Sequence, residues 1–160
     1  MPMTPGTYLR KRREAAGLDL RTVAFRFATL PDARGVMTFD LIDELARLLG
    51  EVEADRDTMS LLQASFLEKV FPMDMSVYER LLLLHQCDGL VSLPHPQVCR
   101  ECACSWHDPC RTRTFTCAWT DDPELCTACS TRPAASKRIS RAPVPQPDWP
   151  DAPHPGGTPA

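Results

Sequence analysis

Seven of the chain's eight cysteines lie between residues 99 and 129, and their spacing constrains the fold more than any other feature of the sequence. The stretch begins with Cys99-x-x-Cys102 and ends with Cys126-x-x-Cys129. Each Cys-x-x-Cys turn carries two thiolates, and two such turns together form a tetrahedral set of sulfur ligands, which is typical of a structural zinc site. We expect these four cysteines to bind zinc, whose binding energy would fold a segment that has few apolar residues.

Four more potential donors lie between these pairs. Cys104, Cys110 and Cys117 supply three sulfurs and His107 supplies an imidazole, so a second zinc site is chemically sensible. Spacing alone is equally compatible with free thiols, and an iron–sulfur cluster is the alternative cofactor, because thiolates bind it as well. A site closed by four thiolates leaves no position for a reactive water, and the chain is therefore not expected to be an enzyme.

The remaining aromatic and thiol residues near this segment are assigned to packing. Trp106 and Trp119 are expected to form the small core of the cysteine segment, with an exposed aromatic platform as the alternative. The eighth cysteine, Cys87, follows a run of leucines and is interpreted as a small core residue rather than a ligand.

Hydrophobic periodicity predicts an all-α fold in the first half of the chain, a five-helix, helix-turn-helix-like bundle. Thr4 before Pro5 is a favourable helix start, Gly17 a left-handed stop, and Asp19 a second cap. Further helices are expected to begin near Thr38, near Thr58 with a capping box at Ser60 and Gln63, and at a second capping box formed by Ser76 and Glu79. The fourth helix is predicted over residues 58–71, with Met59, Leu62, Phe66 and Val70 buried.

These patterns divide the chain into three parts. We expect a helical domain over residues 4–90, a cysteine-rich zinc-binding module over residues 97–130, and a disordered tail over residues 131–160, where half of the chain's 16 prolines are found. There is no secretory leader pattern and no apolar run of membrane-spanning length. Clustered cysteines without such a leader favour the reducing cytoplasm and no membrane partner.

Charge is distributed unevenly along the helices. Residues 1–30 carry six basic and two acidic side chains, whereas residues 31–60 carry three basic and eight acidic ones. The first segment is therefore suited to a polyanion and the second to a basic partner.

The sequence from Tyr8 to Ala24 resembles the opening of the Cro/repressor (XRE-type) helix-turn-helix domains. Residues 52–55 and the helix predicted after them resemble the way in which that family leaves its recognition helix. The cysteines with Asp108-Pro109 and Trp119 are similar to a small cysteine motif of phage and prophage proteins, although Phe115-Thr116 stands where that motif usually has two glycines.

The resemblance implies a small bacterial or phage DNA-binding transcriptional regulator, whose third helix would enter the major groove of duplex DNA and whose zinc module would add contacts or a homodimer surface. The residues expected to contact DNA are Arg10, Lys11, Arg12, Arg13, Arg21, Arg26 and Arg47.

The alternative is a protein-interaction module, a DNA mimic or an adaptor, that keeps the same scaffold. An insertion around residues 31–35 separates the second and third helices. The third helix would also present Asp40, Asp43, Glu44 and Glu51 to its partner, and acidic side chains oppose phosphate binding. This charge pattern favours a basic protein partner at the third helix.

Overall fold

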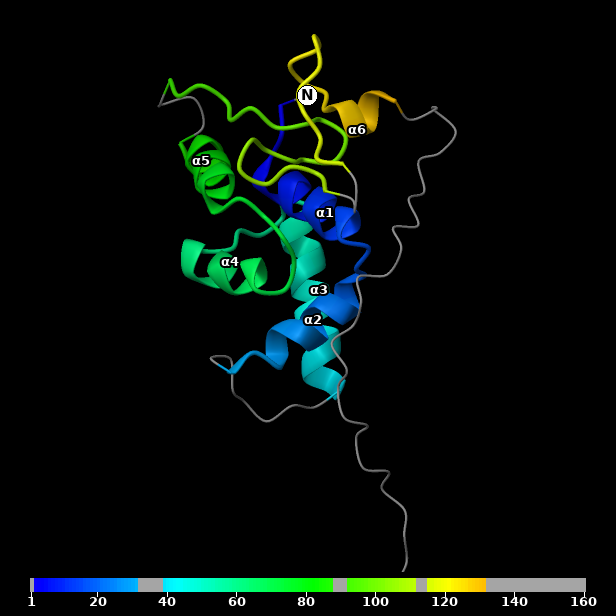
Figure 1. Cartoon of the computed structure of the whole chain (residues 1–160). Helices are drawn as coiled ribbons and strands as arrows, with labels where there is room; N and C mark the ends of the chain where they lie inside the picture. The colour runs from blue at the N-terminus through cyan, green and yellow to red at the C-terminus, as the bar shows by residue number, and fades with distance from the viewer. Residues whose placement is uncertain (1, 32–38, 88–91, 112–114, 132–160) are drawn as a thin grey trace, which may run out of the picture.

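The computed structural model describes residues 2–31, 39–87, 92–111 and 115–131, and helices dominate these ranges (Figure 1). The prediction of a helical body is confirmed, and within the described residues β-structure is limited to two isolated bridges in the cysteine segment. Figure 1 shows α1 between the loops of that segment and α3. The helices are α1 (Pro5–Ala15), α2 (Leu20–Ala28), α3 (Phe39–Glu53), α4 (Leu61–Glu68), α5 (Met75–Gln86) and the short α6 (Thr127–Ser130).

The first two helices begin at the residues that the sequence predicted, and α1 ends just before the predicted stop at Gly17. The hydroxyl of Thr4 accepts a hydrogen bond from the backbone N–H of Thr7 at 3.2 Å, with Pro5 as the first residue of α1. Gly17 follows α1 with φ of +72°, a conformation that favours glycine. The carboxylate of Asp19 then caps α2 by accepting from the N–H of Thr22 at 2.7 Å. These signals are local, so the sequence alone contains them.

The capping box of α4 was predicted correctly, although the helix begins at Leu61 rather than near Thr58, but the cap of α5 was not. Ser60 and Gln63 form the predicted capping box. In α5 the N-cap is Asp74, whose carboxylate accepts hydrogen bonds from the N–H groups of Ser76 and Val77. The predicted box at Ser76 and Glu79 is therefore wrong, because the acidic residue two positions earlier already binds the free N–H groups of the first turn.

The buried face of α4 also differs from the prediction. The helix covers only residues 61–68, so the spacing from Met59 to Val70 is not helical throughout. Met59 and Val70 are buried, but they lie in the loops that flank the helix, whereas Leu62 is 70% exposed. Ala64 and Leu67 form the buried face of α4.

Two tyrosines provide polar anchors inside the helical core. The Tyr8 hydroxyl accepts a hydrogen bond from the N–H of Asp74 at 2.7 Å and donates to its carbonyl at 3.2 Å. The Tyr78 hydroxyl donates to the carbonyl of Met59 at 2.8 Å, and burial raises the pKa of Tyr78 to about 12. Both hydroxyl groups thus stay neutral and satisfied within the apolar core.

The turn that follows α3 contacts the N-terminal end of α1. The Asp55 carboxylate accepts hydrogen bonds from the Thr4 hydroxyl at 2.5 Å and from the N–H of Gly6 at 2.8 Å. Gly6 approaches this turn so closely that a Cβ atom would overlap the carbonyl oxygen of Val52. The absence of a side chain at Gly6 is therefore what permits the contact.

The cysteine segment packs directly on the helical body. Val98 is 9% exposed and Ala103 is fully buried, and both belong to the same apolar core as Tyr8 and Leu81. Residues 88–91, between α5 and the cysteine segment, lie outside the described residues, as does the predicted tail beyond Thr131. The described contacts show that the cysteine segment completes the helical core.

We predict opposite effects of alanine at two glycines. Gly6→Ala should lower the free energy of unfolding by about 1–3 kcal/mol, because the new methyl group collides with backbone. Gly50→Ala is the matched control, since its Cβ would meet only Leu20 at an ordinary 3.5 Å within α3. It should raise stability by up to about 1 kcal/mol. Urea unfolding monitored by circular dichroism measures both, and equal effects would contradict the tight approach at Gly6.

Candidate metal centre and helical pocket

The first cysteine pair lies on a loop that folds back on itself. The N–H of Ala103 donates to the carbonyl of Cys99 at 2.8 Å, and the N–H of Cys99 donates to the carbonyl of Cys104 at 3.0 Å. Ala103 has φ of +56°, which reverses the chain between Cys102 and Cys104. The backbone turn therefore brings the thiols of this loop to one side.

The second pair lies at the start of the short helix α6. Cys126 is the N-cap residue, and the N–H of Cys129 donates to its carbonyl at 3.0 Å. Cys126 also forms a β-bridge with Trp119, and the N–H of Thr127 donates to the carbonyl of Ala118 at 2.8 Å. These contacts hold α6 against the preceding chain.

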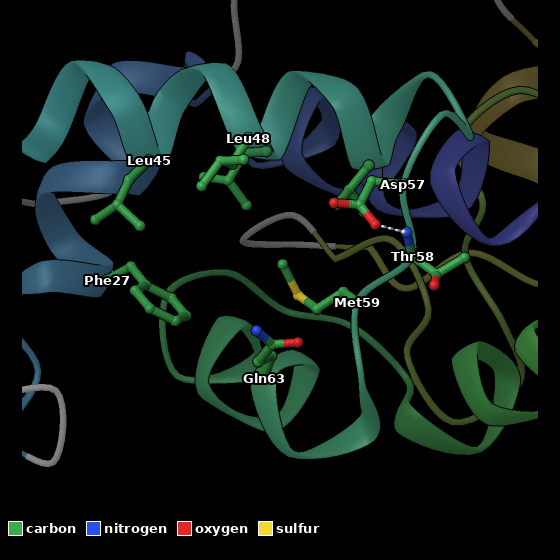
Figure 2. Close-up of a pocket in the computed structure, with 9 residues that line it drawn as sticks. Phe27, Leu45, Leu48, Asp57, Thr58, Met59 and Gln63 are labelled. Carbon is green, nitrogen blue, oxygen red and sulfur yellow. Dashed lines mark hydrogen bonds between the residues drawn. The ribbon is translucent and has the colours of Figure 1, made fainter.

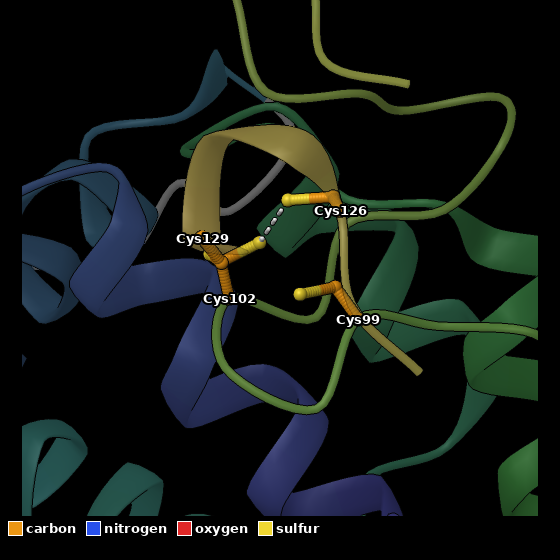
Figure 3. Close-up of side chains that lie close together, drawn as sticks. All are labelled: Cys99, Cys102, Cys126 and Cys129. Atoms are coloured by element: carbon orange, nitrogen blue, oxygen red, sulfur yellow. Dashed lines mark hydrogen bonds between the residues drawn. The ribbon is translucent and has the colours of Figure 1, made fainter. Parts of the chain in front are cut away.

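The two pairs converge into one buried group (Figure 3). The sulfur atoms of Cys99, Cys102, Cys126 and Cys129 all lie within 4.8 Å of one another, and each of the four residues is less than 10% exposed. The structure thus brings together the four residues that the sequence selected as ligands. Such a group could hold a metal ion.

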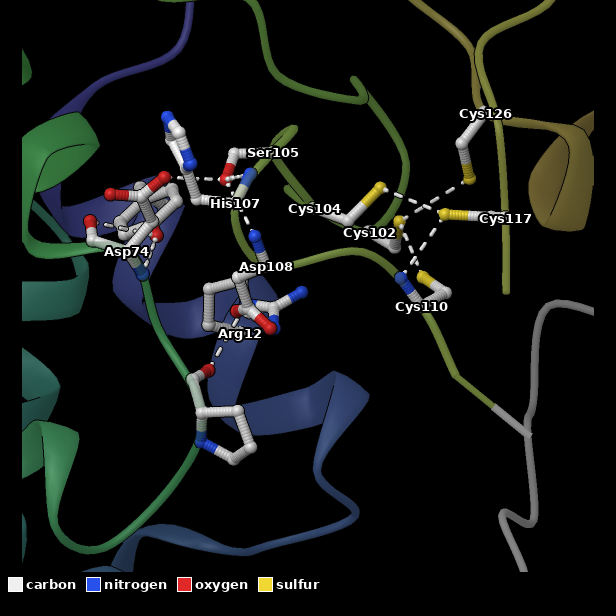
Figure 4. Close-up of polar contacts among 12 residues, drawn as sticks. Arg12, Asp74, Cys102, Cys104, Ser105, His107, Asp108, Cys110, Cys117 and Cys126 are labelled. Carbon is white, nitrogen blue, oxygen red and sulfur yellow. Dashed lines mark hydrogen bonds and ion pairs between the residues drawn. The ribbon is translucent and has the colours of Figure 1, made fainter. Parts of the chain in front are cut away.

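A second group of four cysteines overlaps the first. Cys104 and Cys110 lie within 4.8 Å of both Cys102 and Cys126, and all four are buried. The sulfur of Cys102 lies 3.4 Å from that of Cys110 and 3.8 Å from that of Cys126 (Figure 4). Cys102 and Cys126 therefore belong to both groups.

The two remaining predicted ligands, Cys117 and His107, belong to neither group. Cys117 is half-buried, with its sulfur 3.8 Å from that of Cys104, and it accepts a hydrogen bond from the N–H of Cys110 at 3.1 Å. His107 is exposed and belongs to neither group, and in Figure 4 its ring lies away from the sulfur atoms. The second group therefore differs from the predicted second site. It contains Cys102 and Cys126, which also belong to the first group, in place of Cys117 and His107.

Of the two tryptophans that were predicted to form the small core of this segment, one does so and the other does not. Trp119 is half-buried and packs against the cysteines, as predicted, but Trp106 is 73% exposed and contributes no core. The sulfur atoms themselves form most of the interior of this segment.

Crowded thiols ionise at one another's expense. A hydrogen bond with Cys102 lowers the pKa of Cys110 to about 7, whereas hydrogen bonds with Cys104, Cys110 and Cys126 raise the pKa of Cys102. A cation at the centre would remove this conflict, because it stabilises every thiolate around it.

Polar contacts that the sequence did not predict attach this segment to the helices (Figure 4). Arg12 of α1 is 5% exposed and pairs with Asp108, and its Nε donates to the carbonyl of Pro72 at 3.2 Å. The Ser105 hydroxyl donates to the Asp74 carboxylate at 2.5 Å. The same hydroxyl oxygen accepts from the N–H of Asp108 at 3.1 Å.

Asp74 also contributes pH dependence. Burial raises its pKa, but hydrogen bonds from Ser105, Ser76 and the first turn of α5 lower it more, so the pKa lies below the ordinary value. The carboxylate therefore stabilises the fold above its unfolded-state pKa of about 3.9. This contribution is lost as the pH falls through the lower, folded-state pKa.

Most of the predicted DNA-contacting side chains have partners within the protein. Arg13 donates to both oxygens of Glu53 at 2.6 and 2.7 Å, and it is only 11% exposed. Two others are paired at the surface, and a third binds a backbone carbonyl: Arg21 with Asp43, Arg47 with Glu44, and Lys11 with the carbonyl of Glu101. Arg10 is exposed and Arg26 is half-buried, and neither forms an ion pair with another described residue.

A pocket of about 150 Å³ opens between α2, α3 and α4 (Figure 2). Its walls are mainly apolar, and Asp57, Thr58 and Gln63 add polar groups. Leu48 lines the pocket although 38% of its surface is exposed. The apolar lining consists of Phe27, Leu45, Leu48, Leu49, Val52 and Met59.

No family model matches this chain, and no curated protein or solved structure is significantly similar to it. Within the described residues, no helix combines the length and the apolar character needed to cross a membrane.

We predict that metal binding requires Cys99 but not Cys87. Cys99→Ser should reduce the metal content of the purified protein substantially, because it removes a fully buried member of the first group. Cys87→Ser is the control, since Cys87 ends α5 and belongs to neither group. Elemental analysis measures both variants, and unchanged metal content in Cys99→Ser would contradict the site.

Proposed function

We propose that this chain is a zinc-stabilised protein-interaction module that binds a basic, partly apolar segment of another protein beside α3. The observation that carries this proposal is the pocket between α2, α3 and α4, with apolar walls and the exposed acid Asp57 at its edge. A pocket of this kind suits an apolar side chain of a partner whose neighbouring residues are basic.

The charges on α3 support the same partner chemistry. Asp40, Asp43 and Glu44 are exposed on this helix. Asp43 pairs with Arg21 and Glu44 with Arg47 at the surface, but the helix still has acidic side chains in excess over its single arginine, Arg47. An incoming basic segment gains attraction from such a face, whereas phosphate groups are repelled.

Zinc is the metal that we propose for the cysteine cluster. Four sulfur atoms about 2.3 Å from a central zinc ion form a tetrahedron whose edges are about 3.8 Å long. Cys102 and Cys126 have their sulfur atoms 3.8 Å apart, which matches that edge. Burial of the thiols and the lack of an open position favour a structural role for this zinc.

A DNA-binding regulator is the second candidate function. It is favoured by the α1–Gly17–α2 arrangement, by the resemblance to the Cro/repressor domains, and by Arg10 and Arg26, which keep their charge available. It is weakened by Arg12 and Arg13, because a guanidinium group that is buried in an ion pair cannot also neutralise a phosphate without breaking that pair.

We predict that the pocket selects basic partners. The probes are a fluorescent amphipathic peptide of leucine and lysine and a matched peptide of leucine and glutamate. The first should bind more tightly, and Leu48→Glu should weaken its binding by about tenfold or more, which is about 1.4 kcal/mol.

Leu83→Glu is the control variant, because Leu83 is 43% exposed on α5 and does not line the pocket. Fluorescence anisotropy gives the dissociation constants. Equal binding of the two peptides, or binding that survives Leu48→Glu unchanged, would exclude this site.

A salt series with duplex DNA separates the two functions. Under the interaction proposal, affinity for DNA at physiological salt stays in the non-specific range of about 10⁻⁴–10⁻⁶ M or weaker. Tight binding that weakens steeply with salt, and weakens further in the Arg10→Gln/Arg26→Gln double variant, would establish the regulator instead. Replacement of Lys69 by Gln, on the exposed surface of the loop after α4, controls for a general loss of positive charge.

A further inference from the structure

We infer that the cysteine cluster binds two zinc ions that share the thiolates of Cys102 and Cys126. This inference rests on the proposed zinc binding and extends it from one site to a binuclear centre. It follows from the overlap of the two four-cysteine groups, which together contain six cysteines and have two in common.

The arrangement corresponds to two tetrahedra that share an edge. Each zinc ion needs four ligand positions, so two ions need eight, and two bridging thiolates reduce the number of cysteines to six. The shared edge is the pair Cys102 and Cys126, with a sulfur–sulfur distance of 3.8 Å. Cys99 and Cys129 complete the first tetrahedron, and Cys104 and Cys110 complete the second.

Burial and charge favour two ions over one. With an ion in the first group only, Cys104 at 1% exposure and Cys110 at 9% would remain as buried thiols without a metal. Six thiolates around two divalent ions carry a net charge of about −2, the same as four thiolates around one ion. The second ion therefore adds four favourable bonds without adding net charge to a buried site.

Cys117 lies beside this centre, with its sulfur 3.8 Å from that of Cys104. It lies outside both groups, and its sulfur accepts a hydrogen bond from the backbone N–H of Cys110. Because this contact already occupies the Cys117 sulfur, Cys117 is not counted among the six ligands.

The bridging pair comes from two distant parts of the chain. Cys102 lies on the loop between Cys99 and Cys104, and Cys126 caps α6. Loss of either bridging thiolate should therefore disturb both ions, whereas loss of Cys129 removes a ligand of one ion only.

The test uses the full-length protein, loaded with zinc for native mass spectrometry and with cadmium-113 for NMR. Two ions per chain are expected. Two cadmium signals are also expected, each split by coupling to the other, because scalar coupling between the ions requires a bridging sulfur. Cys117→Ser should keep two ions and the splitting, and Cys126→Ser should abolish the splitting.

Each other outcome overturns a defined part of the argument. One zinc per chain, or two cadmium signals without splitting, would overturn the bridged centre and leave the proposed zinc binding intact. No bound zinc, or the visible absorption of an iron–sulfur cluster in the purified protein, would overturn both. Loss of one ion in Cys117→Ser would overturn the assignment of the six ligands.

Discussion

The contact between α1 and the cysteine segment holds the described parts of the molecule together. Arg12 extends from α1, pairs with Asp108 of the cysteine segment, and donates to the Pro72 carbonyl in the loop before α5. A guanidinium group, whose donors are held in a rigid planar fork, can join three chain segments in this way. Because Arg12 is nearly fully buried, its charge has to be matched inside the protein.

This constraint changes the meaning of the basic stretch in α1. In the sequence, Arg10, Lys11, Arg12 and Arg13 form one cationic run. In the fold they separate, since Arg12 and Arg13 turn toward Asp108 and Glu53 while Arg10 remains exposed. A run of like charges thus becomes two structural ion pairs, one surface charge and one lysine bound to a carbonyl.

The sequence predicted best those features of the structure that depend on neighbouring residues. The caps at Thr4, Asp19 and Ser60 depend only on residues within one helical turn, and all three are present. Asp74 could have been recognised as a cap in the same way, since aspartate is as favourable there as serine. The burial of Arg12 also had a signal, because it follows Tyr8 by four residues on the same helical face.

Apart from the four cysteines of the two Cys-x-x-Cys pairs, contacts between distant residues were beyond such reasoning. The Cys-x-x-Cys spacing predicted which four thiols would meet, because each pair is held by its own turn. Spacing could not show that Cys104 and Cys110 would approach Cys102 and Cys126, since that depends on the path of the intervening chain. It likewise gave no indication that Ser105 would bond to Asp74, 31 residues away.

The apolar core shared by the helices and the cysteine segment has a thermodynamic consequence. Val98 and Ala103 are buried against helical side chains, so the loop that carries the first thiols cannot unfold without exposing part of that core. A metal ion that binds only the folded cluster then stabilises the helices by mass action, by about 2.7 kcal/mol when its free concentration is 100 times its dissociation constant. The thermal stability of helices that contain no ligand would in this way follow the concentration of free metal around the protein.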